Sequence, residues 1–257
     1  MFFPISDDDR DIDSPSFVTY TLLAINIAVF IYQLSNESFT YGWSTIPKEI
    51  TSGVDLVEPQ PVQVPGEGTV DVPQAPGPPI IYLTLLTSMF MHGGIGHIVG
   101  NMLYLWIFGN NVEHRFGHVV FLLFYLFAGL VASFAQIALD PNSVIPNLGA
   151  SGAIAGVMGA YVVLFPRNQI NAVIFYHIVT VPAILVLGMW IATQMVSGFG
   201  SIAATSVSAG GVAYMAHIGG FIAGVVMALP FRMGLGREPD SLLHRQYERD
   251  PRARLWW

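Results

Sequence analysis

Three polar side chains that could perform chemistry together lie within apolar stretches of this sequence: Ser151, His217 and Asn101. Ser151 stands among glycines and alanines in LGASGAIAGVMGAY at 148–161, where small residues would also let two membrane helices touch. A serine and a histidine within hydrogen-bond reach form a nucleophile and its general base. The same stretch therefore has two readings, nucleophilic catalysis by Ser151 and helix packing.

An oxyanion formed by such an attack needs hydrogen-bond donors. His97 and Asn101 are four residues apart, so on a helix they share one face and both can donate. The backbone N–H of Ser151, near a helix N-terminus, could add a third donor. The apolar stretches contain no Asp or Glu that could orient the imidazole of His217, so the pattern predicts a Ser–His dyad rather than a triad.

Composition indicates that these residues belong to a membrane protein. Of 257 residues, 53% are hydrophobic and 11% are charged, whereas a soluble domain carries about 25% charged residues. We expect an all-α polytopic membrane protein, with each span near the roughly 20 apolar residues that cross a bilayer. The six predicted spans are 17–34, 82–108, 119–139, 148–165, 172–196 and 212–230. The net charge of −7 argues against nucleic acid as a partner, because phosphate neutralisation needs a basic patch.

Charge also predicts the orientation of the chain. If the N-terminal segment 1–16 is cytoplasmic, six spans within the domain 17–232 return the Arg-rich tail 233–257 to the same side. Nine of the 10 Lys and Arg residues then lie inside and only Lys48 lies outside, as the positive-inside rule expects. The site would therefore open to the external or periplasmic side.

The first span is expected to be retained in the membrane. The acidic segment before it, SDDDRDIDSPS, lacks the basic n-region of a signal peptide and is not Arg-rich and acid-poor as a mitochondrial transit peptide is. A prokaryotic plasma membrane is the expected location. The external loop at about 35–80 is rich in proline and glycine and is predicted to be extended, and its insertion at 57–79 has no role that the residues indicate.

The three polar side chains are predicted to share one depth. We counted 1.5 Å per residue toward the cytoplasmic arginine that follows each span. Ser151 then lies roughly 24 Å from that arginine, His217 roughly 22 Å and Asn101 roughly 21 Å. This level is below the outer surface of a hydrocarbon core about 30 Å thick. Hydrolysis at that depth would need a water-filled cavity.

Small residues predict that two of the helices approach each other closely. Gly152 and Gly156 form one GxxxG pair on the fourth span, and Gly220 and Gly224 form another on the sixth. The fourth span is short and follows the two prolines of DPNSVIPN. Irregular backbone at depth must line a cavity or be buried in protein, so this helix is predicted to begin below the membrane surface and to floor the cavity.

Each residue alone also has a structural reading. Ser151 would be a packing residue, and His217 would be an interfacial histidine at the wet end of a span. A metal site formed by His92, His97 and His217 would lack a carboxylate or thiolate, and HExxH is missing, so neither metal nor cofactor is expected. A transporter is disfavoured because no inverted repeat is evident. The agreement of three helices in depth favours catalysis.

Taken together, these motifs resemble those of the rhomboid intramembrane serine proteases. GASG resembles the GxSG around the family's nucleophile, and AHIGG resembles the start of the AHxxGxxxG helix that carries its base. The resemblance covers nearly all of the six-span domain, in the family's order. The similar stretches are YGWSTIP (41–47), MHGGIGHIVGN (91–101), WIFGNNVEHRFG (106–117), GASG (149–152) and AHIGG (216–220).

The resemblance implies a six-transmembrane-helix rhomboid-like bundle and a serine-type endopeptidase. It implies Ser151 as nucleophile, His217 as general base, and His97 with Asn101 as the oxyanion hole. The expected partners are the lipid bilayer and single-span membrane proteins that are cleaved in or beside their transmembrane segments. A non-catalytic rhomboid-like binder is the alternative, and the sequence does not indicate an oligomeric state.

The resemblance also implies how substrate would reach the site. The family's lateral gate lies near the fifth span, here around Trp190 and Gln194, and the loop 197–211 would be a cap over the site. Two departures stand out. Ala155 occupies a position, four residues after the serine, where many relatives carry an aromatic residue against the imidazole, and the first loop lacks the Trp-Arg pair of some members.

Overall fold

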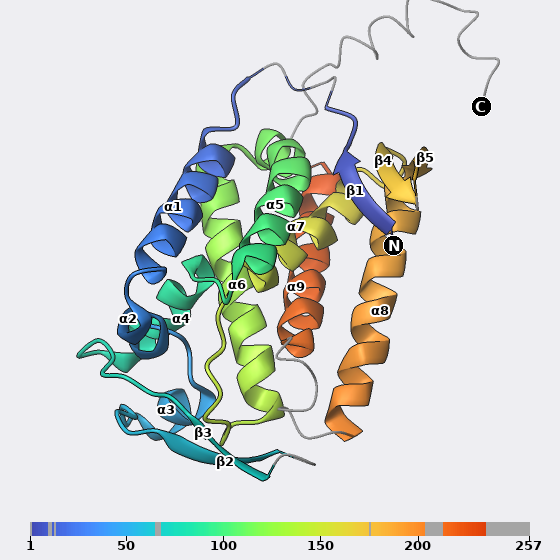
Figure 1. Cartoon of the computed structure of the whole chain (residues 1–257). Coiled ribbons are helices and arrows are strands. Elements are labelled where there is room, and N and C mark those ends of the chain that lie inside the picture. The colour runs from blue at the N-terminus through green and yellow to red at the C-terminus, as the bar shows by residue number, and fades with distance from the viewer. Residues whose placement is uncertain are drawn as a thin grey trace, which may run out of the picture.

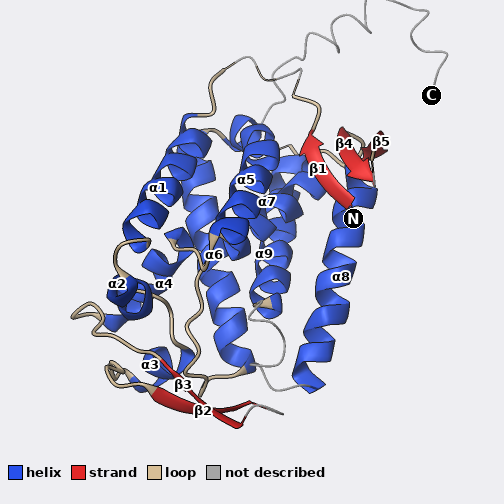
Figure 2. Cartoon of the chain, viewed as in Figure 1, coloured by secondary structure: helices blue, strands red, loops and turns tan. Residues whose placement is uncertain are grey.

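The computed structural model describes residues 2–9, 12, 14–64, 68–174, 176–203 and 213–234. Its long helices stand side by side, and small β-sheets lie at two opposite ends of the molecule (Figures 1 and 2). Among the described residues, the helices of 14 residues or more are α1 (Phe17–Gln33), α5 (Ile95–Phe116), α6 (His118–Leu139), α7 (Ser151–Leu164), α8 (Ala183–Ala203) and α9 (Tyr214–Arg232).

Helix α7 is the centre of the bundle. Nearly all of its side chains are buried, from Gly152 through Tyr161, as expected of a helix that is apolar on every face. Around it pack α5, α6 and α9, whose aromatic residues fill the core; Phe108 and Tyr161 meet edge to face with ring centroids 5.0 Å apart. The residue that begins this central helix is Ser151.

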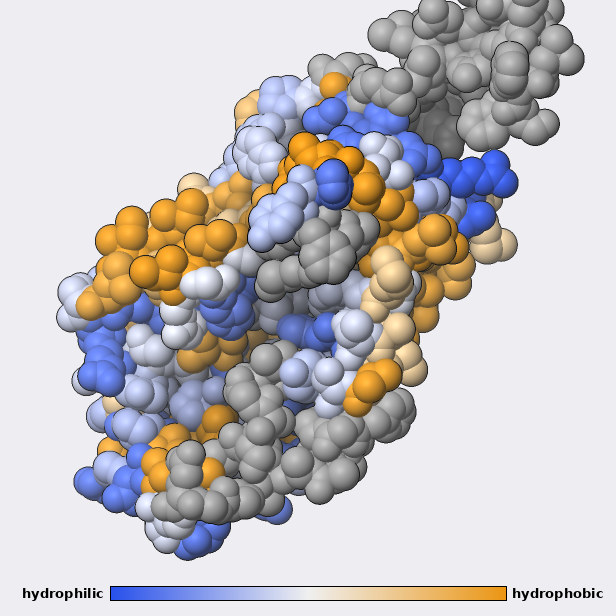
Figure 3. Space-filling model, turned by 45° about the vertical axis from the view of Figure 1, so that its right-hand side comes forward, coloured by the Kyte–Doolittle hydropathy of each residue, from blue (hydrophilic) through white to orange (hydrophobic). Residues whose placement is uncertain are grey.

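Two of the described helices, α6 and α9, are long and apolar enough to cross a bilayer by length and composition. Only 33% and 22% of their most apolar windows are buried, so most of each window faces outward. Figure 3 shows apolar residues along the sides of the molecule and hydrophilic residues largely toward its ends. Large apolar side chains on the outer faces include Ile31, Val119, Leu123 and Val196. Contact of such surfaces with lipid tails costs no free energy, whereas their exposure to water is unfavourable.

The second predicted span, 82–108, is wrong at both ends. Its first part folds as three short turns, η1 (Ile81–Leu83), α4 (Thr84–Thr87) and η2 (Ser88–Phe90), and α5 then runs to Phe116. The backbone is extended at Met91 and Gly94, so α5 begins only after them. Before this break, hydroxyl groups bond to backbone carbonyls. Thr84 Oγ1 donates to Ile81 O at 2.7 Å and Thr87 Oγ1 donates to Trp43 O at 2.8 Å, so these side chains compete for backbone groups.

The fifth predicted span, 172–196, also begins in the wrong place. Its first residues belong to a hairpin of β4 (Gln169–Ile174) and β5 (His177–Pro182), which pair antiparallel. The two strands are rich in the β-branched residues Val, Ile and Thr, which suit a strand, and α8 begins only after Pro182. Strand β1 (Phe2–Ser6) joins the same sheet beside β4, so the N-terminal segment is attached to the bundle.

The Pro-rich segment 35–80 folds without a long helix among its described residues, in keeping with its proline and glycine content. It contains two short helices, α2 (Glu37–Gly42) and α3 (Pro47–Ser52), and a hairpin of β2 (Gln60–Val64) with β3 (Gly68–Val72). These strands lie at the end of the molecule opposite β4 and β5 (Figure 1). Of the expected cap 197–211, the first seven residues continue α8, and 204–211 lie outside the described residues; so does most of the tail, 235–257.

Candidate active site

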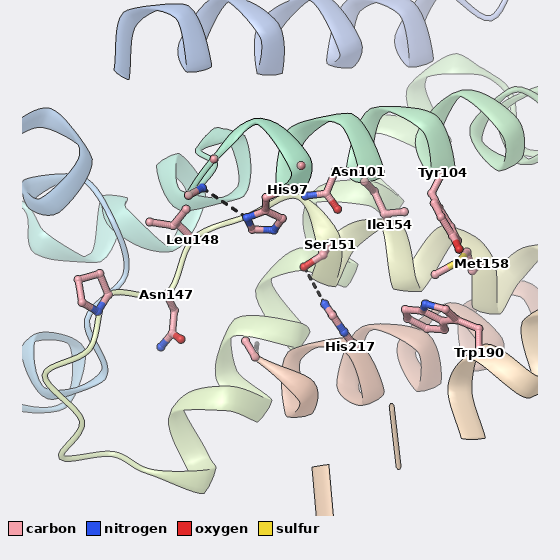
Figure 4. Close-up of a pocket in the computed structure, with 16 residues that line it drawn as sticks. His97, Asn101, Tyr104, Asn147, Leu148, Ser151, Ile154, Met158, Trp190 and His217 are labelled. Atoms are coloured by element: carbon pink, nitrogen blue, oxygen red, sulfur yellow. Dashed lines mark hydrogen bonds between the residues drawn. The ribbon is translucent and has the colours of Figure 1, made fainter. Parts of the chain in front are cut away.

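Ser151 and His217 meet between α7 and α9. The Ser151 hydroxyl oxygen lies 2.8 Å from Nε2 of His217 (Figure 4). Ser151 is the first residue of α7, where backbone N–H groups have no intrahelical acceptor, and His217 is in the first turn of α9. The geometry suits proton transfer from the hydroxyl to the imidazole.

Glycines bring these two helices together, as the GxxxG pairs predict. A Cβ atom at Gly220 would overlap the carbonyl oxygen of Gly152, and one at Gly224 would overlap that of Gly156. The backbones of α7 and α9 are therefore in direct contact at both levels. The distance between Ser151 and His217 depends on how closely α7 and α9 approach. These glycine contacts therefore bring the hydroxyl of Ser151 within reach of the imidazole of His217.

Side chains of α8 and α9 contact the rest of the His217 ring. Nδ1 of His217 lies 2.8 Å from Oε1 of Gln194, and the ring of Trp190 lies 5.6 Å away, centroid to centroid, at an interplanar angle of 39°. Tyr214 approaches the imidazole edge to face at 6.5 Å. Ala155 is fully buried in the core and supplies no ring. The aromatic contacts of this imidazole are provided by Trp190 of α8 and Tyr214 of α9.

His97 and Asn101 lie on α5 beside Ser151 (Figure 4). Nδ1 of His97 accepts a hydrogen bond from the backbone N–H of Gly93 at 3.3 Å, so a neutral ring carries its proton on Nε2. Asn101 is buried, and its Nδ2 has no hydrogen-bond partner among the described residues. Both side chains thus have a donor available for an oxyanion near Ser151.

Gly149 explains how His97 comes so close to the serine. Its φ of +135° is a conformation that favours glycine, and a Cβ there would lie 2.8 Å from both Cε1 and Nε2 of His97. The same Cβ would lie 3.6 Å from Oγ of Ser151. The first glycine of GASG therefore provides the space in which the imidazole of His97 faces the hydroxyl.

These residues line a cavity of about 710 Å³. A volume of this size accommodates an extended peptide segment of a few residues. The wall combines α5, the segment before α7, the start of α7, α8 and α9. The lining includes His97, Asn101, Tyr104, Asn147, Leu148, Ser151, Ile154, Met158, Trp190 and His217. Polar groups are gathered at the serine, and apolar side chains form the rest of the wall.

His92 does not share the cavity. Gln33 holds its backbone, since His92 N donates to Oε1 at 2.9 Å and Gln33 Nε2 donates to His92 O at 3.3 Å. The His92 ring packs edge to face on His97 with centroids 5.2 Å apart. These contacts give His92 a structural role, in which it braces the turn before His97. Within the described part of the chain, no three His, Cys, Asp or Glu side chains gather in a group suited to a metal ion.

Sequence reasoning missed the contact between Gln194 and His217. It named Gln194 only through a family resemblance, as part of a gate. The signal that could have revealed the contact is the amide itself. Gln194 is a polar side chain inside an apolar helix, one turn after Trp190, and a polar group at such a site needs a partner.

Comparisons with known proteins point to one family. The family described as Rhomboid domain matches residues 81–234. The chain is 37% identical to Rhomboid protease GluP of Bacillus subtilis (strain 168) over 155 residues, 60% of this chain and 27% of that protein. It is 28% identical to Rhomboid protein 1, mitochondrial, of Saccharomyces cerevisiae over 217 residues, 82% of this chain and 52% of that protein.

A third similar protein is Presenilin-associated rhomboid-like protein, mitochondrial, of Mus musculus. It is 31% identical over 110 residues, which are 42% of this chain and 29% of that protein. The aligned parts thus cover between 27% and 52% of the length of these three relatives.

Proposed function

The chain belongs to the rhomboid family, and we propose that it is an intramembrane serine endopeptidase that cleaves transmembrane segments of single-span membrane proteins. The observation that carries this proposal is the 2.8 Å approach of Ser151 Oγ to His217 Nε2 beside the cavity. Family membership supports an integral membrane protein with several helices. The name of the similar Bacillus protein, a rhomboid protease, supports the activity.

The proposed reaction uses the contacts described above. Ser151 Oγ attacks the carbonyl carbon of the scissile peptide bond while Nε2 of His217 takes the hydroxyl proton. The oxyanion accepts hydrogen bonds from His97, Asn101 and the backbone N–H of Ser151. The imidazolium then protonates the leaving amine, and an acyl-enzyme remains on Ser151. Water, activated by the same imidazole, releases the second product and restores the hydroxyl.

The proposed arrangement in the bilayer has six spans, formed by α1, α5, α6, α7, α8 and α9. Both termini would then be cytoplasmic, with the β2–β3 hairpin and the cavity mouth on the opposite side. Substrate would enter laterally near α8. Because the matched relatives include mitochondrial proteins as well as a bacterial one, the prokaryotic plasma membrane expected from the sequence is not supported. We propose only an integral membrane location.

The competing function is that of a non-catalytic rhomboid-like protein that binds membrane proteins without cutting them. Such a protein has no need of a serine hydrogen-bonded to an imidazole or of unused donors around it. This chain has the hydroxyl, the imidazole and a buried Asn101 amide without a partner in the described structure. These groups favour catalysis.

Cleavage of a reconstituted single-span substrate tests the proposal. Ser151→Ala and His217→Ala are each expected to abolish cleavage, and an activity-based serine probe is expected to label wild type but not Ser151→Ala. His177→Ala is the matched control, because this histidine lies on β5, exposed and outside the cavity. Wild-type cleavage by Ser151→Ala would refute the assignment.

A further inference from the structure

We propose that Gln194 is a positioning residue for His217, because its side-chain oxygen holds the imidazole in the one tautomer that can take the proton of Ser151. The inference rests on the proposed function and adds a third member to the pair. It places on α8 the orienting group that a carboxylate supplies in serine-protease triads.

The contacts of the two ring nitrogens support this role. Nδ1 of His217 lies 2.8 Å from Oε1 of Gln194, and Nε2 lies 2.8 Å from Oγ of Ser151. An amide oxygen only accepts hydrogen bonds, so Nδ1 must carry the ring proton. A neutral imidazole has one N–H, so Nε2 is then an acceptor and faces the serine hydroxyl. The amide thus selects the base form of the ring.

The orientation of the amide is itself determined by α8. Thr193 Oγ1 donates to the carbonyl oxygen of Trp190 at 2.6 Å, which uses the hydroxyl hydrogen. Gln194 Nε2 can therefore donate to Thr193 Oγ1 at 3.2 Å, and it also lies 3.5 Å from the Trp190 carbonyl. A flipped amide would turn its oxygen toward that carbonyl oxygen, which is unfavourable. The hydrogen bonds then form one continuous chain. Gln194 donates to Thr193, His217 donates to Gln194, and Ser151 donates to His217.

A neutral orienting group suits this location. Among the described residues, the titratable side chains that line the cavity are His97, Tyr104 and His217, and Tyr214 also contacts the imidazole. None of them is a carboxylate that could select the tautomer. An ionised Asp or Glu at membrane depth would be costly to bury, whereas an amide with both ends hydrogen-bonded is not.

Steady-state kinetics of the full-length protein in proteoliposomes tests the inference across pH 5 to 9. Gln194→Leu removes the acceptor, and kcat is expected to fall roughly 10-fold or more, because part of the roughly 10²–10⁴-fold contribution of the general base is lost. KM should change less than threefold. Gln194→Glu restores an acceptor, so it should recover much of kcat. The acid limb of the pH profile of kcat should move to higher pH in the Glu variant, because a carboxylate stabilises the protonated imidazole of His217. Thr193→Val should give an intermediate loss.

Several outcomes would overturn the inference. A Gln194→Leu enzyme with kcat within twofold of wild type would do so, as would a change confined to KM. Equal losses in the Leu and Glu variants with an unchanged pH profile would indicate a packing role. If the Leu variant loses its thermal unfolding transition, the pH profile of Gln194→Glu decides alone, and no shift counts against Gln194. An active Ser151→Ala enzyme would refute the proposed function itself.

Discussion

The indole of Trp190 covers the imidazole of His217, with ring centroids 5.6 Å apart, although the two residues lie on different helices. Ala155 on α7 is buried and presents no ring to this imidazole. Tyr214 of α9 also approaches the imidazole, at 6.5 Å between centroids, so the indole is the closer of the two rings. Together with the Gln194 hydrogen bond, this contact makes the orientation of the base depend on α8.

Trp190→Leu should lower kcat because the imidazole loses its aromatic neighbour. An aromatic pair contributes roughly 0.5–1.5 kcal/mol, so the expected loss is about 2- to 10-fold. Trp190→Phe keeps a ring and should lose less. Cleavage kinetics at saturating and at low substrate concentration separate the two parameters. A rise in KM with kcat unchanged would show that Trp190 serves substrate binding instead.

Gly149→Ala should impair catalysis through His97. The new Cβ would lie 2.8 Å from the imidazole at a backbone conformation of φ +135° that favours glycine, and strain of this kind costs about 1–3 kcal/mol. We expect kcat to fall roughly 10-fold or more as the oxyanion donor is displaced. Gly188→Ala is the matched control, because a Cβ at that position on α8 meets no atom within 4 Å. Equal activity of the two variants would contradict the role of Gly149.

Gly224→Ala should separate α7 from α9. Its Cβ would overlap the carbonyl oxygen of Gly156, and overpacking of this kind costs about 1–3 kcal/mol. Thermal unfolding in detergent should shift to lower temperature, and cleavage should fall because Ser151 and His217 move apart. Ile222→Ala, on the exposed face of the same helix, should leave cleavage near the wild-type rate. Unchanged stability of the Gly224→Ala protein would argue against direct backbone contact.

The helix α6 and the meeting of α7 with α9 were predictable from the sequence. The predicted span 119–139 corresponds to α6 at His118–Leu139. An uninterrupted apolar run of that length is typical of a single transmembrane helix. Depth counting brought Ser151 and His217 to one level, and the glycine pairs predicted that their helices touch. The structure brings the two side chains within hydrogen-bond distance.

Apolar runs that fold as strands or broken turns could not be predicted in this way. Residues 172–182 are as apolar as a transmembrane span, so hydropathy alone does not distinguish helix from strand here. They form strands because β4 pairs with β1 and with β5. The contact of Gln194 with His217 was also out of reach. It depends on the rotation of α8 about its own axis, and hydropathy does not report which face of an apolar helix points to a neighbour.

Glu49 gives the Pro-rich segment 35–80 a pH-dependent contact. It lies on α3 and is buried, and its Oε1 accepts a hydrogen bond from the backbone N–H of Leu56 at 2.8 Å. Burial raises the pKa of Glu49 from its ordinary 4.5 to about 7, with a further contribution from the charge of Asp55. Asp55 in turn accepts from the backbone N–H of Gly77 at 3.0 Å. These contacts tie three parts of the segment together.

The segment should therefore be most stable in acid. A carboxyl whose pKa is raised in the folded state favours the protonated form, so its contribution is complete below about pH 4.5 and is lost as the pH rises through about 7. Hydrogen exchange of residues 47–56 should be slower at pH 5 than at pH 8, after correction for the intrinsic rate. Glu49→Gln should flatten this difference, whereas Glu58→Gln, at an exposed position, should preserve it. A wild-type segment that is better protected at pH 8 would contradict the burial of a neutral carboxyl at Glu49.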